Sequence, residues 1–165
     1  MRVIFLDRDG VINEDFGYVG SVKDFKFIDG VFEALREFLD MGYKLVVVTN
    51  QSGIGRGYYT LEDFNEVTEH MKSELEKRGI ELLEVFYCPH HPDRGCGCRK
   101  PEPGMIEEAV KRYGIDTKNS WMIGDKPSDI EAAKSAGVGN TVLLKKKTLF
   151  DTIGIIKNRR GDYEI

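Results

Sequence analysis

The feature that most constrains the fold is a regular alternation of short apolar runs with segments of helical periodicity. The predicted strands cover residues 3–6, 45–48, 82–87, 121–123 and 141–144, and the predicted helices cover 31–41, 60–78, 103–113 and 128–136. Such alternation predicts an α/β fold, a Rossmann-like parallel sheet with helices on both faces. Ligands of these sheets bind outside the carboxyl ends of the strands, so polar residues directly after a strand are the first site candidates.

Length and charge narrow the class of protein. The chain has 165 residues and is 41 % apolar, so we expect a single domain over 1–165 with its core at about 2–144. The segment from about Lys145 is weakly patterned and carries no functional prediction. A net charge of −4 disfavours binding to nucleic acid or to an anionic membrane. Asp7 ends the first apolar run too early for a signal peptide, and no run approaches the roughly 20 residues of a membrane helix. We therefore expect a cytoplasmic protein. We also expect it to be a monomer.

Two carboxylates follow the first predicted strand. Asp7 closes the strand and Asp9 comes two residues later. Carboxylates this close repel each other unless a cation lies between them or one is protonated. Mg²⁺ suits such oxygen ligands, and one carboxylate can attack phosphorus while the other transfers protons. The alternative is a turn with two solvated acids.

Later strand ends and one loop carry groups suited to a phosphate. Thr49 and Asn50 end the second predicted strand, and their hydroxyl and amide can donate hydrogen bonds to phosphate oxygens. Lys100 can neutralise charge on a transferring phosphoryl group. Asp125 follows the fourth predicted strand, whereas Asp129 lies near a helix start and is a candidate supporting carboxylate. Each group alone is common, but three strands that deliver such groups to one edge predict a site.

Three cysteines and a histidine predict a zinc loop at residues 88–98. The pattern is Cys-x-His, five residues and Cys-x-Cys, with the candidate ligands Cys88, His90, Cys96 and Cys98. This is the ligand set of a closed tetrahedral Zn²⁺ site, which leaves no position for a catalytic water. His91 is an alternative ligand, and the odd cysteine count disfavours a disulfide framework. Because Arg99 and Lys100 follow directly, we expect the metal to fix where these cations point.

The order Asp-x-Asp, Thr-Asn, Lys and Gly-Asp-x-x-x-Asp resembles the haloacid dehalogenase superfamily of phosphatases over about residues 2–144. Segments 7–13, 49–57 and 98–101 are similar to the D-glycero-D-manno-heptose-1,7-bisphosphate 7-phosphatases, with the histidinol-phosphate phosphatases as close relatives. The resemblance also favours the histidine of Cys-Pro-His as the zinc ligand.

The resemblance implies a role for each candidate residue. Asp7 would be the nucleophile and Asp9 the general acid and base, while Thr49 and Lys100 would orient and neutralise the phosphoryl group. Asp7, the backbone carbonyl of Asp9 and Asp125 would hold Mg²⁺. The residues expected to contact substrate are Asp15, Phe16, Gly17, Tyr18, Asn50, Gln51, Ser52, Arg99 and Lys126.

The spacing of the motifs leaves no room for a cap domain. Loops must therefore wall the site, and the candidates are 15–27, 52–59 and 88–98. We expect a phosphatase of a small sugar phosphate, most directly heptose bisphosphate, with histidinol phosphate as the alternative substrate. A phosphatase of nucleic-acid ends and a non-catalytic zinc-stabilised binding module are the other interpretations.

Overall fold

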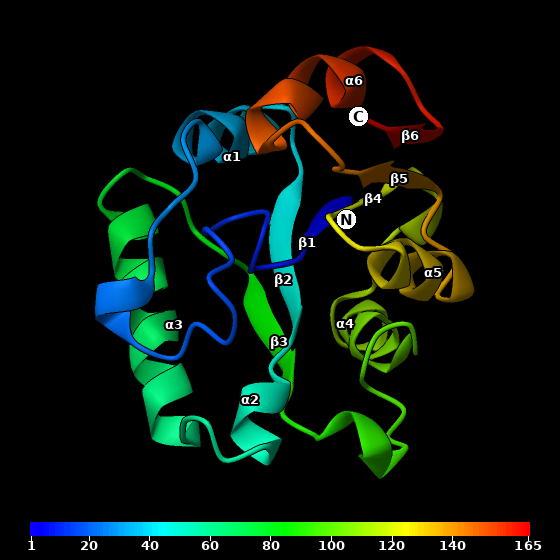
Figure 1. Cartoon of the computed structure of the whole chain (residues 1–165). Coiled ribbons are helices and arrows are strands. Elements are labelled where there is room, and N and C mark those ends of the chain that lie inside the picture. The colour runs from blue at the N-terminus through cyan, green and yellow to red at the C-terminus, as the bar shows by residue number, and fades with distance from the viewer.

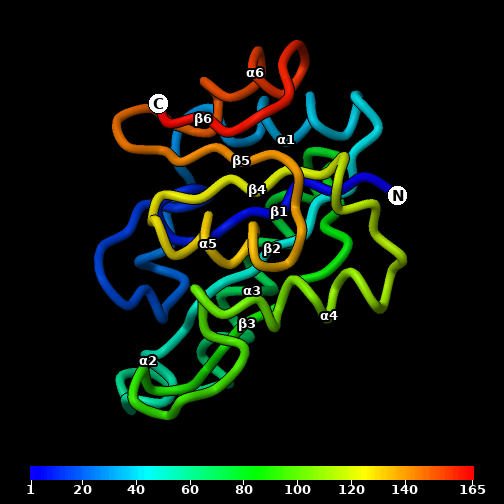
Figure 2. Tube along the Cα trace, turned by 90° about the vertical axis from the view of Figure 1, so that its right-hand side faces the viewer, coloured from blue at the N-terminus to red at the C-terminus, as the bar shows by residue number.

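The predicted sheet is present and has six strands. The computed structural model describes residues 1–165. Its strands are β1 (Val3–Leu6), β2 (Lys44–Asn50), β3 (Glu84–Cys88), β4 (Trp121–Gly124), β5 (Asn140–Leu143) and β6 (Asp162–Glu164). All neighbouring pairs are parallel, in the order β3-β2-β1-β4-β5-β6. Figure 2 shows the strands stacked from β6 to β3, which confirms the Rossmann-like α/β fold.

Helices cover both faces of the sheet. They are α1 (Val31–Asp40), α2 (Ser52–Gly55), α3 (Leu61–Glu76), α4 (Gly104–Tyr113), α5 (Pro127–Ser135) and α6 (Ile153–Asn158). Helices α1 and α3 lie on one side of the sheet and α4 and α5 on the other (Figure 1). None of the helices is both long and apolar enough to cross a membrane.

Strand β1 shows why the apolar runs predict strands correctly. Successive side chains of a strand point to opposite faces, so Ile4 and Leu6 pack with α1 and α3, while Val3 and Phe5 pack with α4 and α5. All four side chains are fully buried. Burial of each contributes about 1.5–3 kcal/mol relative to exposure. A strand buried on both faces is therefore continuously apolar rather than alternating.

The C-terminal segment, for which the sequence predicted no element, widens the sheet. Strand β6 follows α6 and pairs with β5, so the sheet continues beyond residue 144. Asn140 holds this addition, because its Nδ2 donates to the carbonyl oxygen of Ser120 at 3.0 Å and its Oδ1 accepts from Gly161 N at 2.9 Å. Periodicity could not reveal β6, since it is three residues long and two of them are acidic.

Replacing Asn140 by alanine should weaken the attachment of β6. The substitution leaves the Gly161 N–H and the Ser120 carbonyl without these partners, at a cost of about 1–3 kcal/mol. We expect urea denaturation to give a free energy of unfolding lower by about that amount, and amides 161–165 to exchange faster with deuterium. Asn158→Ala is the matched control, because Asn158 is exposed and its amide bonds only to Gly154 O. Equal losses in both variants would contradict this role of Asn140.

Candidate active site

The carboxyl ends of three neighbouring strands meet at one cavity. Asp7 follows β1, Thr49 and Asn50 end β2, and Asp125 follows β4. Since β1 lies between β2 and β4, these residues share one edge of the sheet. A cavity of about 530 Å³ opens there, and Asp7 and Asp9 line it. This is where parallel α/β sheets bind their ligands.

Lys100 is the buried cation of the cavity. The residue is 4 % exposed, and its Nζ lies 3.0 Å from Asp7 Oδ1, 2.6 Å from Asp129 Oδ1 and 2.7 Å from Val48 O. Burial lowers the pKa of Lys100, but the two carboxylates outweigh burial and raise the pKa above its ordinary value. The side chain is therefore charged, and its three hydrogens are all engaged within the site.

Asp7, Asp125 and Asp129 form an acidic cluster whose carboxylate oxygens lie within 4.8 Å of one another. Burial raises the pKa of Asp7 to about 6 although Lys100 opposes the rise. Burial and the neighbouring Asp7 raise the pKa of Asp125 to about 6 as well. Asp125 Oδ1 is buried and has no hydrogen-bond partner. Oxygen ligands gathered in this way, one of them without a donor, suit a hard divalent cation.

Gly10 allows the first loop to pass close to this cluster. Its φ is +86°, a conformation that residues with a side chain rarely adopt. A Cβ atom at this position would lie 2.0 Å from Asp125 Oδ2. The glycine after Asp9 is therefore required by the approach of the loop to the carboxylate.

Asp9 lies outside the acidic cluster, and three side chains hold its carboxylate. Arg8 Nη2 and Asn13 Nδ2 each donate to Asp9 Oδ1 at 2.9 Å, and Gln51 Nε2 donates to Oδ2 at 3.1 Å. Arg8 is 1 % exposed. Sequence reasoning did not identify Arg8 or Asn13 as site residues. Their place in the segment around Asp7 was the only available signal, because burial of an arginine cannot be read from a motif.

Most of the residues expected to contact substrate line the cavity. These are Asp15, Gly17, Tyr18, Asn50, Gln51, Ser52, Arg99 and Lys126. Phe16 does not line it and is 64 % exposed. Thr49 is fully buried beside the cavity, and its hydroxyl accepts a hydrogen bond from Gln51 Nε2 at 2.9 Å. Tyr59 and Ser128 also line the cavity. Tyr59 ends the predicted wall segment 52–59, whereas nothing in the pattern of the sequence distinguished Ser128.

Asn50 joins the end of β2 to the loop that carries Lys100. Its Nδ2 donates to the carbonyl oxygen of Lys100 at 3.1 Å, and its Oδ1 accepts from the backbone N–H of Lys100 at 3.0 Å. The amide thus binds the main chain of Lys100 on both sides. The backbone of the lysine is fixed by Asn50, and its ammonium group is fixed by the two carboxylates.

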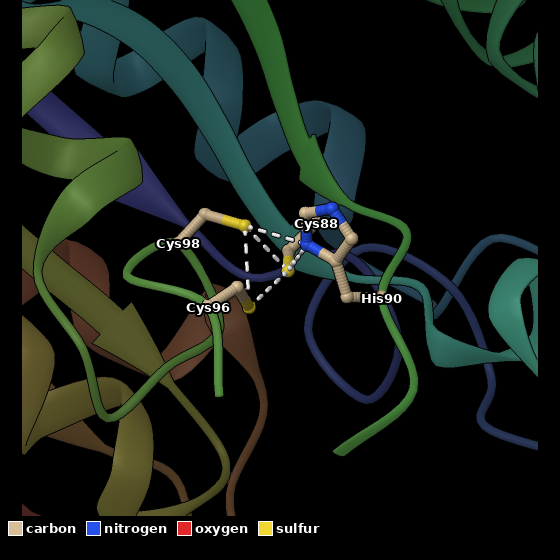
Figure 3. Close-up of side chains that lie close together, drawn as sticks. All are labelled: Cys88, His90, Cys96 and Cys98. Carbon is tan, nitrogen blue, oxygen red and sulfur yellow. Dashed lines mark hydrogen bonds between the residues drawn. The ribbon is translucent and has the colours of Figure 1, made fainter. Parts of the chain in front are cut away.

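The side chains of the expected zinc loop point toward one another (Figure 3). Cys88 Sγ lies 3.5 Å from Cys96 Sγ and 2.7 Å from Cys98 Sγ, and His90 Nδ1 lies 3.2 Å from Cys98 Sγ. Ligands of a tetrahedral zinc–thiolate site are about 3.8 Å apart, because each Zn–S bond is about 2.3 Å long. All four candidate ligand atoms lie within 4.8 Å of one another, so the cluster is compatible with a metal ion such as zinc. His91 lies outside the cluster, and its Nδ1 accepts from Asp93 N at 3.1 Å.

Known proteins resemble the chain over most of its length. A Pasteurella multocida protein named D-glycero-beta-D-manno-heptose-1,7-bisphosphate 7-phosphatase is 49 % identical over 150 residues, which are 87 % of this chain and 82 % of the relative. A Photorhabdus laumondii protein named as the phosphatase of the alpha anomer is 42 % identical over 152 residues, which are 88 % of this chain and 83 % of the relative.

A solved structure and a family model agree with these relatives. The crystal structure of D,D-heptose 1,7-bisphosphate phosphatase from B. bronchiseptica, complexed with magnesium and phosphate, superimposes with a TM-score of 0.86 at 32 % identity. The match covers 100 % of this chain and 92 % of that one. The family model described as haloacid dehalogenase-like hydrolase matches residues 13–143, which include Lys100 and Asp125. The chain therefore belongs to the haloacid dehalogenase-like hydrolases.

Proposed function

We propose that this chain is a Mg²⁺-dependent phosphatase that hydrolyses D-glycero-D-manno-heptose 1,7-bisphosphate to the heptose 1-phosphate. The observation that carries the proposal is the contact of the buried Lys100 ammonium with Asp7 in the wall of the cavity. This contact places a carboxylate and a positive charge side by side where a phosphate can enter. The choice of substrate is supported by the names of the relatives, to which the chain is about half identical.

Asp7 is the proposed nucleophile. Attack by its carboxylate on phosphorus forms an aspartyl-phosphate and breaks the bond from phosphorus to the sugar oxygen. Lys100, 3.0 Å from Asp7 Oδ1, is suited to neutralise charge on the transferring group. Thr49, buried next to Gln51, is proposed to orient that group.

Asp9 is the proposed general acid and base. It gives a proton to the departing sugar oxygen, which leaves as an alcohol. It then takes a proton from the water that attacks the aspartyl-phosphate. That second step releases phosphate and restores the carboxylate of Asp7, so the enzyme is regenerated.

Asp7, the backbone carbonyl of Asp9 and Asp125 are the proposed ligands of Mg²⁺. The unpaired buried oxygen of Asp125 and the all-oxygen donor set support this assignment. When bound, the ion supplies positive charge that offsets repulsion between the carboxylates and the substrate phosphate.

Arg99 and Lys126 are proposed to bind the rest of the substrate, together with the lining residues of the first loop. Lys126 Nζ lies 3.7 Å from Asp15 and 3.6 Å from Asp125, so a cation and a carboxylate are both available at the cavity wall. Sugar hydroxyls of the substrate can donate to the carboxylate, and hydroxyl or phosphate oxygens can accept from the ammonium. The exposure of Phe16 favours a place at the rim of the cavity rather than contact with the substrate.

We also propose that the protein is cytoplasmic and monomeric.

The cluster of Cys88, His90, Cys96 and Cys98 is proposed to hold a structural Zn²⁺. Four protein ligands leave no open position for chemistry. The proposed use of the metal is mechanical, because Cys98 is two residues from Lys100.

Asp7→Asn should abolish turnover while the fold remains. The substitution is nearly isosteric but removes the attacking charge, so we expect a loss on the order of 10⁴-fold or more in kcat. Phosphate release measures turnover, and fluorine NMR with beryllofluoride tests whether wild-type Asp7 carries the acyl-phosphate mimic. Asp40→Asn, an exposed acid on α1, is the matched control and should keep full activity. Turnover like that of the wild type in Asp7→Asn, or activity that survives EDTA, would contradict the mechanism.

The substrate can be identified by comparing kcat/KM for the two anomers of the heptose bisphosphate and for histidinol phosphate. A site that hydrogen-bonds a substrate group strongly rejects an analogue without it, so we expect histidinol phosphate to be poorer by about 10²-fold or more. The relative named for the beta anomer is 49 % identical and the one named for the alpha anomer 42 %, so we expect the beta anomer to be preferred, by about tenfold, the effect of roughly 1.4 kcal/mol. A higher kcat/KM for histidinol phosphate would replace the proposed substrate but keep the phosphatase chemistry.

Joint replacement of Cys96 and Cys98 by serine should remove the zinc and disorder the loop. Part of the free energy of metal binding would be lost from folding. We expect elemental analysis to fall from about one zinc per chain to none, kcat to fall and KM to rise, with the far-UV circular dichroism of the core unchanged. His91→Ala is the control and should retain the metal, because His91 lies outside the cluster. Unchanged kinetics after verified loss of zinc would separate the metal from substrate binding.

A further inference from the structure

Gln51 lines the cavity, yet its side-chain amide is used almost entirely within the protein. The residue is 2 % exposed. Its Nε2 donates to Asp9 Oδ2 at 3.1 Å and to Thr49 Oγ1 at 2.9 Å, so both hydrogens are engaged. Its Oε1 accepts from the hydroxyl of Tyr59. Little hydrogen-bonding capacity is left for a substrate.

The neighbours of Gln51 permit only this orientation of the amide. A reversed amide would turn Oε1 toward the Asp9 carboxylate, and two acceptors would then face each other. The hydroxyl of Tyr59 must therefore donate to Oε1. Burial raises the pKa of Tyr59 to about 12, with Arg8 opposing and Asp9 adding to the rise, so the hydroxyl keeps its proton.

Two glycines create the space that the Tyr59 ring occupies. A Cβ atom on Gly20 would lie 2.4 Å from Tyr59 Cγ, and one on Gly53 would lie 2.2 Å from Tyr59 Cε1. The ring is thus enclosed between the first wall loop and α2. Its hydroxyl has a fixed position from which to hold Gln51.

The two carboxylate oxygens of Asp9 are not equivalent. Oδ1 accepts from Arg8 Nη2 and Asn13 Nδ2 at 2.9 Å and lies 3.3 Å from Arg8 Nε, which fills its roughly two lone-pair positions. Oδ2 accepts only from Gln51. One position on Oδ2 is therefore free for a proton.

We infer that Gln51, oriented by Tyr59, is a positioning residue that fixes Asp9 with Oδ2 as the oxygen that exchanges a proton with the leaving group. This inference rests on the proposed function, and it gives Gln51 a role other than contact with the substrate. As the bond from phosphorus to the sugar oxygen breaks, the proton on Oδ2 moves to that oxygen. The sugar leaves as an alcohol, Asp7 keeps the phosphoryl group, and Asp9 is left as a carboxylate.

The test compares Gln51→Met with Asp9→Asn on two leaving groups. The heptose bisphosphate loses an alkoxide that needs a proton, whereas p-nitrophenyl phosphate loses a phenolate that does not. Because general acid catalysis is worth about 10²–10⁴-fold, we expect Asp9→Asn to lower kcat/KM about 10²-fold more for the heptose substrate, and Gln51→Met about tenfold more. Tyr59→Phe keeps the ring and removes the donor, with an expected selective loss of about threefold. Tyr163→Phe, which also removes only a hydroxyl but lies on β6 away from the cavity, is the matched control and should leave kcat/KM unchanged for both substrates.

The outcomes separate this inference from the proposed function. Equal losses for both substrates in Gln51→Met, with Asp9→Asn still selective, would overturn the inference alone. A rise in KM for the heptose substrate with unchanged kcat would also overturn it, because that result indicates contact with the substrate. Equal losses in Asp9→Asn would contradict the proposed function instead. Thermal unfolding checks each fold, and Gln51→Glu, which keeps the size but removes the donor facing Oδ2, should show the same selective loss if Gln51→Met does not fold.

Discussion

The geometry of the cavity depends on one buried ammonium group. Lys100 Nζ binds Asp7, Asp129 and the carbonyl oxygen of Val48, so it links the residue after β1, the first turn of α5 and the end of β2. A buried ion pair recovers the cost of leaving water only when its hydrogen bonds are complete. Here every hydrogen of the ammonium has an acceptor. The lysine therefore holds its carboxylates in place and leaves net negative charge for a cation to offset.

The carboxylate of Asp9 is bound by a different set of side chains from the carboxylate of Asp7. Asp9 is held by Arg8, Asn13 and Gln51, none of which touches Lys100. Two carboxylates two residues apart thus lie in separate hydrogen-bond networks, one centred on a lysine and one on an arginine and an amide. Under the proposed mechanism, that separation lets one carboxylate attack phosphorus while the other transfers protons.

The sequence predicted the parts of this arrangement that depend on local pattern. Strands buried on both faces are visible as apolar runs, and the rule for parallel sheets then places Asp7, Thr49 and Asp125 at one edge. The cluster of three cysteines and a histidine could be predicted because its members are close in sequence. The burial of Arg8, the space for Tyr59 between Gly20 and Gly53, and the pairing of β6 all depend on contacts between distant segments. No periodicity records such contacts, so they required the structure.

The two hydrogen bonds between the Asn50 amide and the main chain of Lys100 bear on how the loop can vary in evolution. Through them the main chain of Lys100 is anchored to β2, a strand inside the sheet. Residues 93–95, which lie between His90 and Cys96 in the loop, are exposed. They do not line the cavity, so insertions there can lengthen the loop while Asn50 keeps the main chain of Lys100 in place. The chain thus has a segment that can vary in length without moving the buried ammonium group.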